Sequence, residues 1–166
     1  MKKLIVLFSI IISGLAVAQD NYFRGRLATE AKSFSVGLNS SNLSFSNKNK
    51  TDYINADLNA GYFIWDRFQA KVGVVADLTF KPSDTRADIS YSAGVKYYAG
   101  NMFPIYIGYY GANGYNLKNI KSYLDLRAGY AYFLSNSISI EPSVGYLYSD
   151  SEANVFKFNF GINLFF

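Results

Sequence analysis

Hydrophobic residues alternate with polar or small residues over most of the chain after residue 33. In the segment YINADLNAGYF, every second position from Ile54 to Tyr62 is apolar, and the positions between them carry Asn, Asp or Gly. The segment FQAKVGVVADLTF repeats the pattern from Phe68 to Phe80. Successive side chains of a β-strand point to opposite faces, so a period of two predicts strands with one apolar and one polar face.

The same period recurs in the segments ADISYSAGVKYYA, IKSYLDLRAGYAYF, ISIEPSVGYLY and VFKFNFGINLFF, and we place two further strands within Ser33–Ser46 and Pro104–Asn113. Strands of about 5 to 6 residues are usual in globular proteins. These runs are longer and match the 9 to 11 or so tilted residues that cross a bilayer. The sequence therefore predicts an all-β fold, an eight-stranded antiparallel up-and-down transmembrane β-barrel.

The connections between these runs are of two kinds. FIWDR, GNMF and FLSNS are tight and partly apolar, whereas NKNKT, KPSDTR, GYNLKN and SDSEAN are polar. This alternation is typical of a membrane barrel with both termini on the short-turn side. Two irregularities are expected: a bulge at Pro142, which lacks an N–H, and either a bulge or a strand end near Ser40-Ser41, where the apolar positions change parity.

The segment MKKLIVLFSIIISGLAVA has the basic start, apolar run and small terminal residues of an export signal. We expect residues 1–18 to be cleaved before Gln19, residues 19–32 to form a short periplasmic leader without a motif, and residues 33–166 to form the barrel. The chain has no cysteine, so neither disulfides nor a lipid-anchoring thiol are available.

Alternation alone does not tell which face of the barrel is inside. A soluble calyx would turn its apolar face inward. Here the polar face carries few charges and many Gly and Ser residues, which does not suit a water-exposed surface. The apolar face has aromatic residues near the strand ends, as an interfacial girdle requires, namely Tyr62, Tyr97, Tyr109, Tyr130, Tyr132, Tyr146, Phe156 and Phe166. We therefore predict that the polar face lines the lumen.

An eight-stranded lumen is just filled by side chains. We expect its charged residues to pair as a polar network, with a conducting path as the alternative: Asp57, Lys71, Asp77, Lys96, Asp125, Arg127, Glu141 and Lys157. The polar face also carries one glycine per strand, and we expect these glycines near one level: Gly37, Gly61, Gly73, Gly94, Gly108, Gly129, Gly145 and Gly161. They would leave room inside the barrel for Tyr98, Tyr106, Tyr110 and Phe133. A chance scatter of a common residue is the alternative.

The chain ends in NFGINLFF, with a polar residue, a glycine two positions on, a large apolar residue three further and a terminal aromatic: Asn159, Gly161, Leu164 and Phe166. From Ser33 to Phe166 the sequence resembles the small outer-membrane β-barrel family, the OmpA-like and OmpX-like eight-stranded group. The resemblance implies that these four residues form a signal that the outer-membrane assembly machinery reads during insertion. A final strand that merely completes the core is the alternative.

The resemblance also implies residence in the outer membrane of a Gram-negative-type cell, as a monomer in contact with outer-membrane lipid and lipopolysaccharide. Basic residues in the polar loops suit anionic lipopolysaccharide, although they equally suit plain solvated tips: Lys48, Lys50, Lys81, Arg86 and Lys118. The formal net charge of +4 would fall to +2 with the loss of Lys2 and Lys3 in the signal, and so small a surplus makes no case for nucleic-acid binding.

Small outer-membrane lipid A acyltransferases and deacylases are the enzymes that such a chain could resemble, and that resemblance would imply a catalytic histidine. The chain has none, so we expect no enzyme, no cofactor and no metal site. We predict a structural or surface-interaction role in the envelope. The alternatives are a narrow small-solute or ion channel and a secreted calyx for a hydrophobic ligand.

Overall fold

A computed structural model describes residues 20–40, 43–46, 51–81, 84–113, 120–149 and 154–166. Its strands are β1 (Phe34–Ser40), β2 (Leu43–Ser46), β3 (Thr51–Trp65), β4 (Phe68–Lys81), β5 (Asp84–Ala99), β6 (Phe103–Asn113), β7 (Ile120–Gly129), β8 (Tyr132–Ser135), β9 (Ile138–Tyr148) and β10 (Val155–Phe165). Residues 20–28 form a helix. Among the described residues, no helix is both long and apolar enough to cross a membrane.

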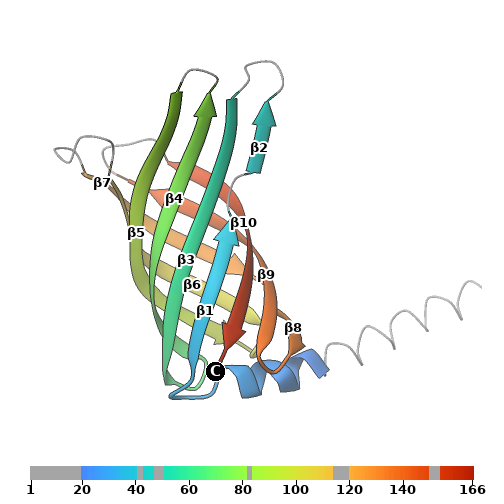
Figure 1. The fold of residues 1–166 in the computed structure, drawn as a ribbon. Helices are drawn as coiled ribbons and strands as arrows, with labels where there is room; N and C mark the ends of the chain where they lie inside the picture. Colours follow the sequence, from blue (N-terminus) through green and yellow to red (C-terminus); the bar gives the residue numbers. More distant parts are fainter. Residues whose placement is uncertain (1–19, 41–42, 47–50, 82–83, 114–119, 150–153) are drawn as a thin grey trace, which may run out of the picture.

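The strands form one closed antiparallel sheet (Figure 1). Neighbours follow the order β1-β10-β9-β7-β6-β5-β4-β3, and β1 also pairs with β3, which completes the ring. β2 continues the position of β1 along β3, and β8 continues that of β7 along β9. The ring therefore has eight strand positions, and the predicted up-and-down eight-stranded barrel is confirmed.

The parity change in the first strand has a structural counterpart. Asn39 is opposite Asp57 on β3, and Leu43 is opposite Ile54. The first strand thus has one residue more than its partner between these two pairs. An extra residue is the mark of a β-bulge.

The bulge expected at Pro142 is wrong. β9 pairs with β10 without a register shift through Pro142, which is opposite Phe160. The irregularity lies on the other neighbour, because β7 ends at Gly129 and β8 begins at Tyr132, and the Tyr130 N–H donates to the Pro142 carbonyl at 3.0 Å. A break in the adjacent strand accommodates the missing proline N–H.

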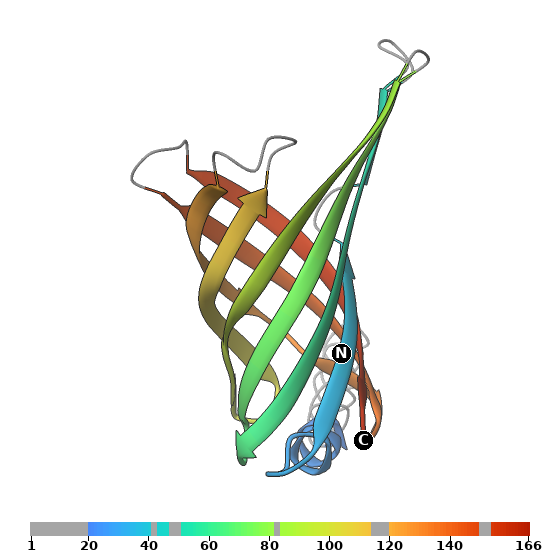
Figure 2. The ribbon, with the colours of Figure 1, turned by 60° about the vertical axis from the view of Figure 1, so that its left-hand side comes forward.

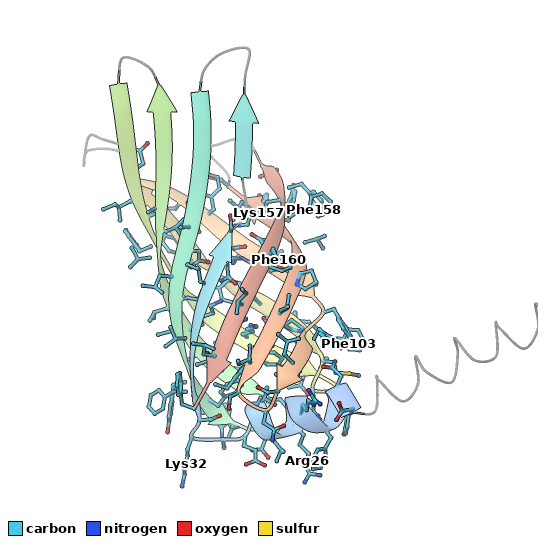
Figure 3. The ribbon with its side chains drawn as sticks, turned by 45° about the vertical axis from the view of Figure 1, so that its right-hand side comes forward. Arg26, Lys32, Phe103, Lys157, Phe158 and Phe160 are labelled. Carbon is cyan, nitrogen blue, oxygen red and sulfur yellow. The ribbon has the colours of Figure 1, made fainter. Side chains whose placement is uncertain are left out.

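The polar face lines the lumen. Along β1, Phe34, Val36 and Leu38 are exposed, and the residues between them are buried. β10 repeats this order, and Figure 3 shows Phe158 and Phe160 outside the barrel wall. The predicted face assignment is confirmed, and an apolar-lined calyx is wrong for the described residues.

The two ends of the barrel differ. At one end lie the tight turns, the C-terminus and the helix, which is packed across the opening (Figures 1 and 2). At the other end β3, β4 and β5, of 15, 14 and 16 residues, extend beyond the shorter strands. An apolar cluster fills the tight-turn end: Ala28, Phe63, Tyr98, Ala131, Phe133 and Phe165.

Candidate functional site

The charged side chains inside the barrel meet across the lumen. Lys96 on β5 lies 2.5 Å from Glu141 on β9, measured from Nζ to Oε2. The other carboxylate oxygen of Glu141 accepts hydrogen bonds from the Tyr98 hydroxyl at 2.8 Å and the Ser139 hydroxyl at 3.0 Å. All four side chains are buried. A buried carboxylate with this many donors is electrostatically satisfied.

Arg127 on β7 is the centre of a second group. Its Nε lies 3.0 and 2.9 Å from the two carboxylate oxygens of Asp125, and its Nη2 lies 2.5 Å from Oδ2 of the same residue. Its Nη1 reaches Asp57 on β3 at 3.4 Å, and Lys157 on β10 reaches Asp125 at the same distance. One guanidinium therefore links two walls of the barrel.

Lys71 on β4 differs from the other lumen cations. Its side chain is buried, and its Nζ lies 5.7 Å from the centroid of the Tyr106 ring, in cation–π range. Within the described part of the chain, Lys71 forms no ion pair. The side chain of Asp77, the remaining member of the predicted network, lies outside the described residues.

Amide side chains surround these charges. Asn39 and Asn59 donate to the carboxylate of Asp57 at 3.3 and 3.4 Å. Gln69 donates to the Ser35 hydroxyl at 2.7 Å. The period of two had placed these residues on the polar face without indicating a role for them. Their buried hydrogen bonds extend the polar network from the charged centre to β1.

The lumen glycines are spaces for these long side chains. All eight occupy positions on the lumen-facing side of their strands. The register places most of them opposite a longer polar residue, as Gly61 is opposite Lys71 and Gly145 is opposite Lys157. A Cβ on Gly37 would meet the amides of Asn59 and Asn163. Of the predicted interior aromatics, Tyr98, Tyr106 and Phe133 are buried, and Tyr110 is half-buried. The glycines thus give room to polar as well as aromatic side chains.

The helix closes the tight-turn end, which the sequence pattern did not predict. The Asn21 amide donates to the Ala131 carbonyl at 2.9 Å and to the Tyr130 hydroxyl at 3.0 Å, and its oxygen accepts the Phe133 N–H at 2.6 Å. Thr29 and Arg67 join the end of the helical segment to the first tight turn, with a backbone bond of 2.7 Å. Asn21, Gly25 and Ala28 have helical spacing, which was the available signal.

The four residues of the predicted assembly signal lie on both faces of the last strand. Asn159 and Gly161 point into the lumen, whereas Leu164 and Phe166 point outward. Backbone bonds between Phe34 and Phe166, 3.0 and 2.9 Å long, join the chain end to β1. This arrangement seals the barrel, and the role in assembly stays a prediction.

Little space remains inside. A cavity of about 30 Å³ lies between the charged groups and is lined by Asn39, Lys71, Lys96, Pro104, Tyr106, Arg127, Glu141, Ser143 and Asn159. That volume suits one or a few water molecules. The arrangement can hold small polar species but offers no wide path in the described part of the lumen.

No protein-family model matches the sequence, and no curated protein matches it. Solved structures do match. The N-terminal β-barrel domain of Pseudomonas aeruginosa OprF has a TM-score of 0.58 at 12% identity, covering 82% of this chain and 98% of that one. A de novo designed transmembrane β-barrel has a TM-score of 0.53 at 15% identity, covering 82% and 98%.

The outer membrane protein Ail of Yersinia pestis, in a phospholipid bilayer nanodisc, has a TM-score of 0.52 at 16% identity, covering 82% of this chain and 99% of that one. At these identities the similarity concerns the fold. It agrees with the closed ring of eight strand positions. The protein therefore has the fold of the small, eight-stranded transmembrane β-barrels of outer membranes.

Proposed function

We propose that the protein is an integral outer-membrane β-barrel with a structural or surface-interaction role in the envelope. The observation that carries the proposal is the inside-out distribution of side chains. Val72 and Val74 on β4 and Leu126 on β7 are exposed on the outer wall, whereas the charges of Arg127 and Glu141 are held inside. Such a surface is stable in hydrocarbon and aggregates in water.

The tight-turn end then faces the periplasm. Aromatic side chains mark this end on the outer wall, with ring contacts between Phe34 and Tyr62 and between Trp65 and Phe68. Rings of this kind suit the interfacial region of a bilayer. The predicted export signal and the position of the helix at this end fit the same orientation.

The opposite end supports a role at the cell surface. A strand needs about 9 to 11 residues to cross the membrane, and β3, β4 and β5 contain 15, 14 and 16. These three strands would project several residues beyond the bilayer as a paired sheet, available to a surface partner. Lipopolysaccharide is one proposed contact, through Lys81 and Arg86 at the ends of this sheet. The structure does not describe the side chains of the basic loop residues, which are Lys48, Lys50, Lys81, Arg86 and Lys118.

The membrane assignment is tested by the electrophoretic mobility of the protein from isolated outer membranes, compared unheated and boiled in detergent. We expect a folded band whose mobility changes only after boiling, and retention in the membrane through a carbonate wash. A freely soluble protein without a mobility shift would overturn the proposal.

A narrow channel is the second candidate, because charged and polar side chains cross the lumen between its two ends. The small cavity and the helix across the tight-turn end argue against conduction. Single-channel recording of the refolded protein in planar bilayers decides between the two. We expect no resolved conductance, and steady openings that persist in the intact chain would favour the channel.

The proposed lipopolysaccharide contact is tested separately with the double variant Lys81→Gln/Arg86→Gln. We expect weaker binding to lipopolysaccharide-containing vesicles and unchanged insertion. Unchanged lipid binding would remove lipopolysaccharide from the proposal.

The proposed assembly signal is tested by deleting Phe166, which should reduce the amount of folded protein in cells but permit refolding in detergent.

A further inference from the structure

More positive than negative charge surrounds the small cavity inside the barrel. The cations that line it among the described residues are Lys71, Lys96 and Arg127, and the carboxylate is Glu141. The charges at this cavity are therefore not balanced by its own lining.

The excess charge lies at Lys71. Lys96 is paired with Glu141, and Arg127 is paired with Asp125 and Asp57. Lys71 is only 9% exposed and forms no ion pair among the described residues. A buried ammonium without a counter-charge is strongly unfavourable.

A second, independent feature lies at the same cavity. Asn159 on β10 is 7% exposed, and its Nδ2 has no hydrogen-bond acceptor in the described structure. Asn159 and Lys71 both line the cavity of about 30 Å³. A buried amide donor without an acceptor in the protein is uncommon and points to a water molecule or an ion beside it. Two kinds of donor thus meet at a space large enough for one small species.

We propose that this cavity binds a single small inorganic anion of the chloride class, which accepts hydrogen bonds from the Lys71 ammonium and the Asn159 amide. A water molecule could accept from Asn159 but would leave the charge of Lys71 uncompensated. Glu141 also lines the cavity, but its carboxylate is occupied by Lys96, Tyr98 and Ser139. The volume excludes organic anions such as gluconate.

Chloride is tested first on the full chain refolded in detergent. The temperature at which the folded band disappears on unheated gels is measured in sodium chloride and in sodium gluconate at equal ionic strength. We expect chloride to raise this temperature saturably, by about 3 °C at concentrations well above the dissociation constant. Equal temperatures in the two salts would overturn the proposal and assign water to the cavity.

Variants locate the effect. Lys71→Gln removes the cation, and Asn159→Asp supplies a carboxylate that replaces the anion, so both should lose the chloride dependence. Arg26→Gln, on the exposed face of the helix (Figure 3), removes an equal charge outside the lumen and should keep it. A chloride effect that persists in Asn159→Asp would overturn the site even if Lys71→Gln does not fold. Crystals soaked in sodium bromide should show an anomalous peak between Lys71 and Asn159.

Discussion

Nζ of Lys96 lies 2.5 Å from Oε2 of Glu141, and the two side chains are 6% and 7% exposed. Their strands, β5 and β9, are not neighbours in the sheet, because β6 and β7 lie between them. The ion pair therefore spans the lumen. It fixes the distance between two walls of the barrel in a region where the apolar outer face contributes no packing between walls.

Breaking this pair on one side should destabilise the barrel strongly. Glu141→Gln keeps the shape of the side chain but leaves the Lys96 ammonium buried without a counter-charge. We expect the free energy of unfolding to fall by about 3–5 kcal/mol. Urea titration in detergent, followed by the fluorescence of Trp65, the single tryptophan, measures the change.

The double variant Lys96→Met/Glu141→Gln is the matched control. It removes the unpaired charge, while the amide oxygen that replaces the carboxylate can still accept from Tyr98 and Ser139. The double variant should therefore be more stable than Glu141→Gln alone. A double variant as unstable as the single one would show that the loss does not come from an uncompensated ammonium.

Asn21 holds the helix at the barrel end, because its amide makes three hydrogen bonds with Tyr130, Ala131 and Phe133. Arg24 of the same helix also donates to the Leu134 carbonyl. Asn21→Ala leaves the buried Phe133 N–H without an acceptor, at a cost of about 1–3 kcal/mol. Since about 1.4 kcal/mol is a factor of ten in an equilibrium constant, we expect trypsin to cleave after Arg24 and Arg26 faster by a factor between about 5 and about 150. The gel mobility of the barrel itself should not change.

Tyr22→Ala serves as the control for this experiment, because Tyr22 is 46% exposed on the outer side of the same helix. It should leave the rate of cleavage nearly unchanged. If Asn21→Ala and Tyr22→Ala are cleaved at equal rates, the amide does not hold the helix in place.

The strands and their inward faces could be predicted because the alternation of residues such as Val36, Gly37 and Leu38 fixes which side chains share a face. The partners inside the lumen could not be predicted this way. Lys96 and Glu141 are both placed inward by their period, but their contact depends on the tilt of strands that are 45 residues apart in sequence. The parity change near Ser40 could likewise be seen in the sequence. The sequence did not show that a break between β7 and β8, and not a bulge in β9, accommodates Pro142.

The helix of residues 20–28 illustrates the other limit. Isolated helices shorter than about 12 residues are marginal in water, so this segment depends on docking against Ala131 and Phe133. Its sequence carries the spacing of Asn21, Gly25 and Ala28, but no local pattern indicates the surface that receives them. Lys71 shows the same limit at the candidate anion site, because the period places it inside and only the fold shows that it forms no ion pair among the described residues.

Two lumen glycines should respond differently to alanine. A Cβ on Gly94 would meet backbone atoms of β6, the Ile107 carbonyl and the Gly108 Cα, which cannot move without distorting the sheet. A Cβ on Gly145 would lie 3.1 Å from Lys157 Cε and 3.2 Å from Asn159 Nδ2, both on flexible side chains. We expect Gly94→Ala to lower the free energy of unfolding by about 1–3 kcal/mol and Gly145→Ala by less. Equal losses in urea titration would contradict this reading of the glycines.

A charge on the outer wall provides the most direct test of the bilayer as the surrounding solvent. Val74 on β4 is 55% exposed and lies seven positions beyond the tight turn at Arg67, near the middle of the wall, whereas Ile64 is 43% exposed beside that turn. In phospholipid vesicles, Val74→Arg should lower the free energy of unfolding by about 2–4 kcal/mol, and Ile64→Arg by only about 0–1 kcal/mol, because the arginine reaches the headgroups there. Denaturant titration of both variants in vesicles measures the difference. Equal losses at the two positions in vesicles would mean that the apolar wall does not face lipid.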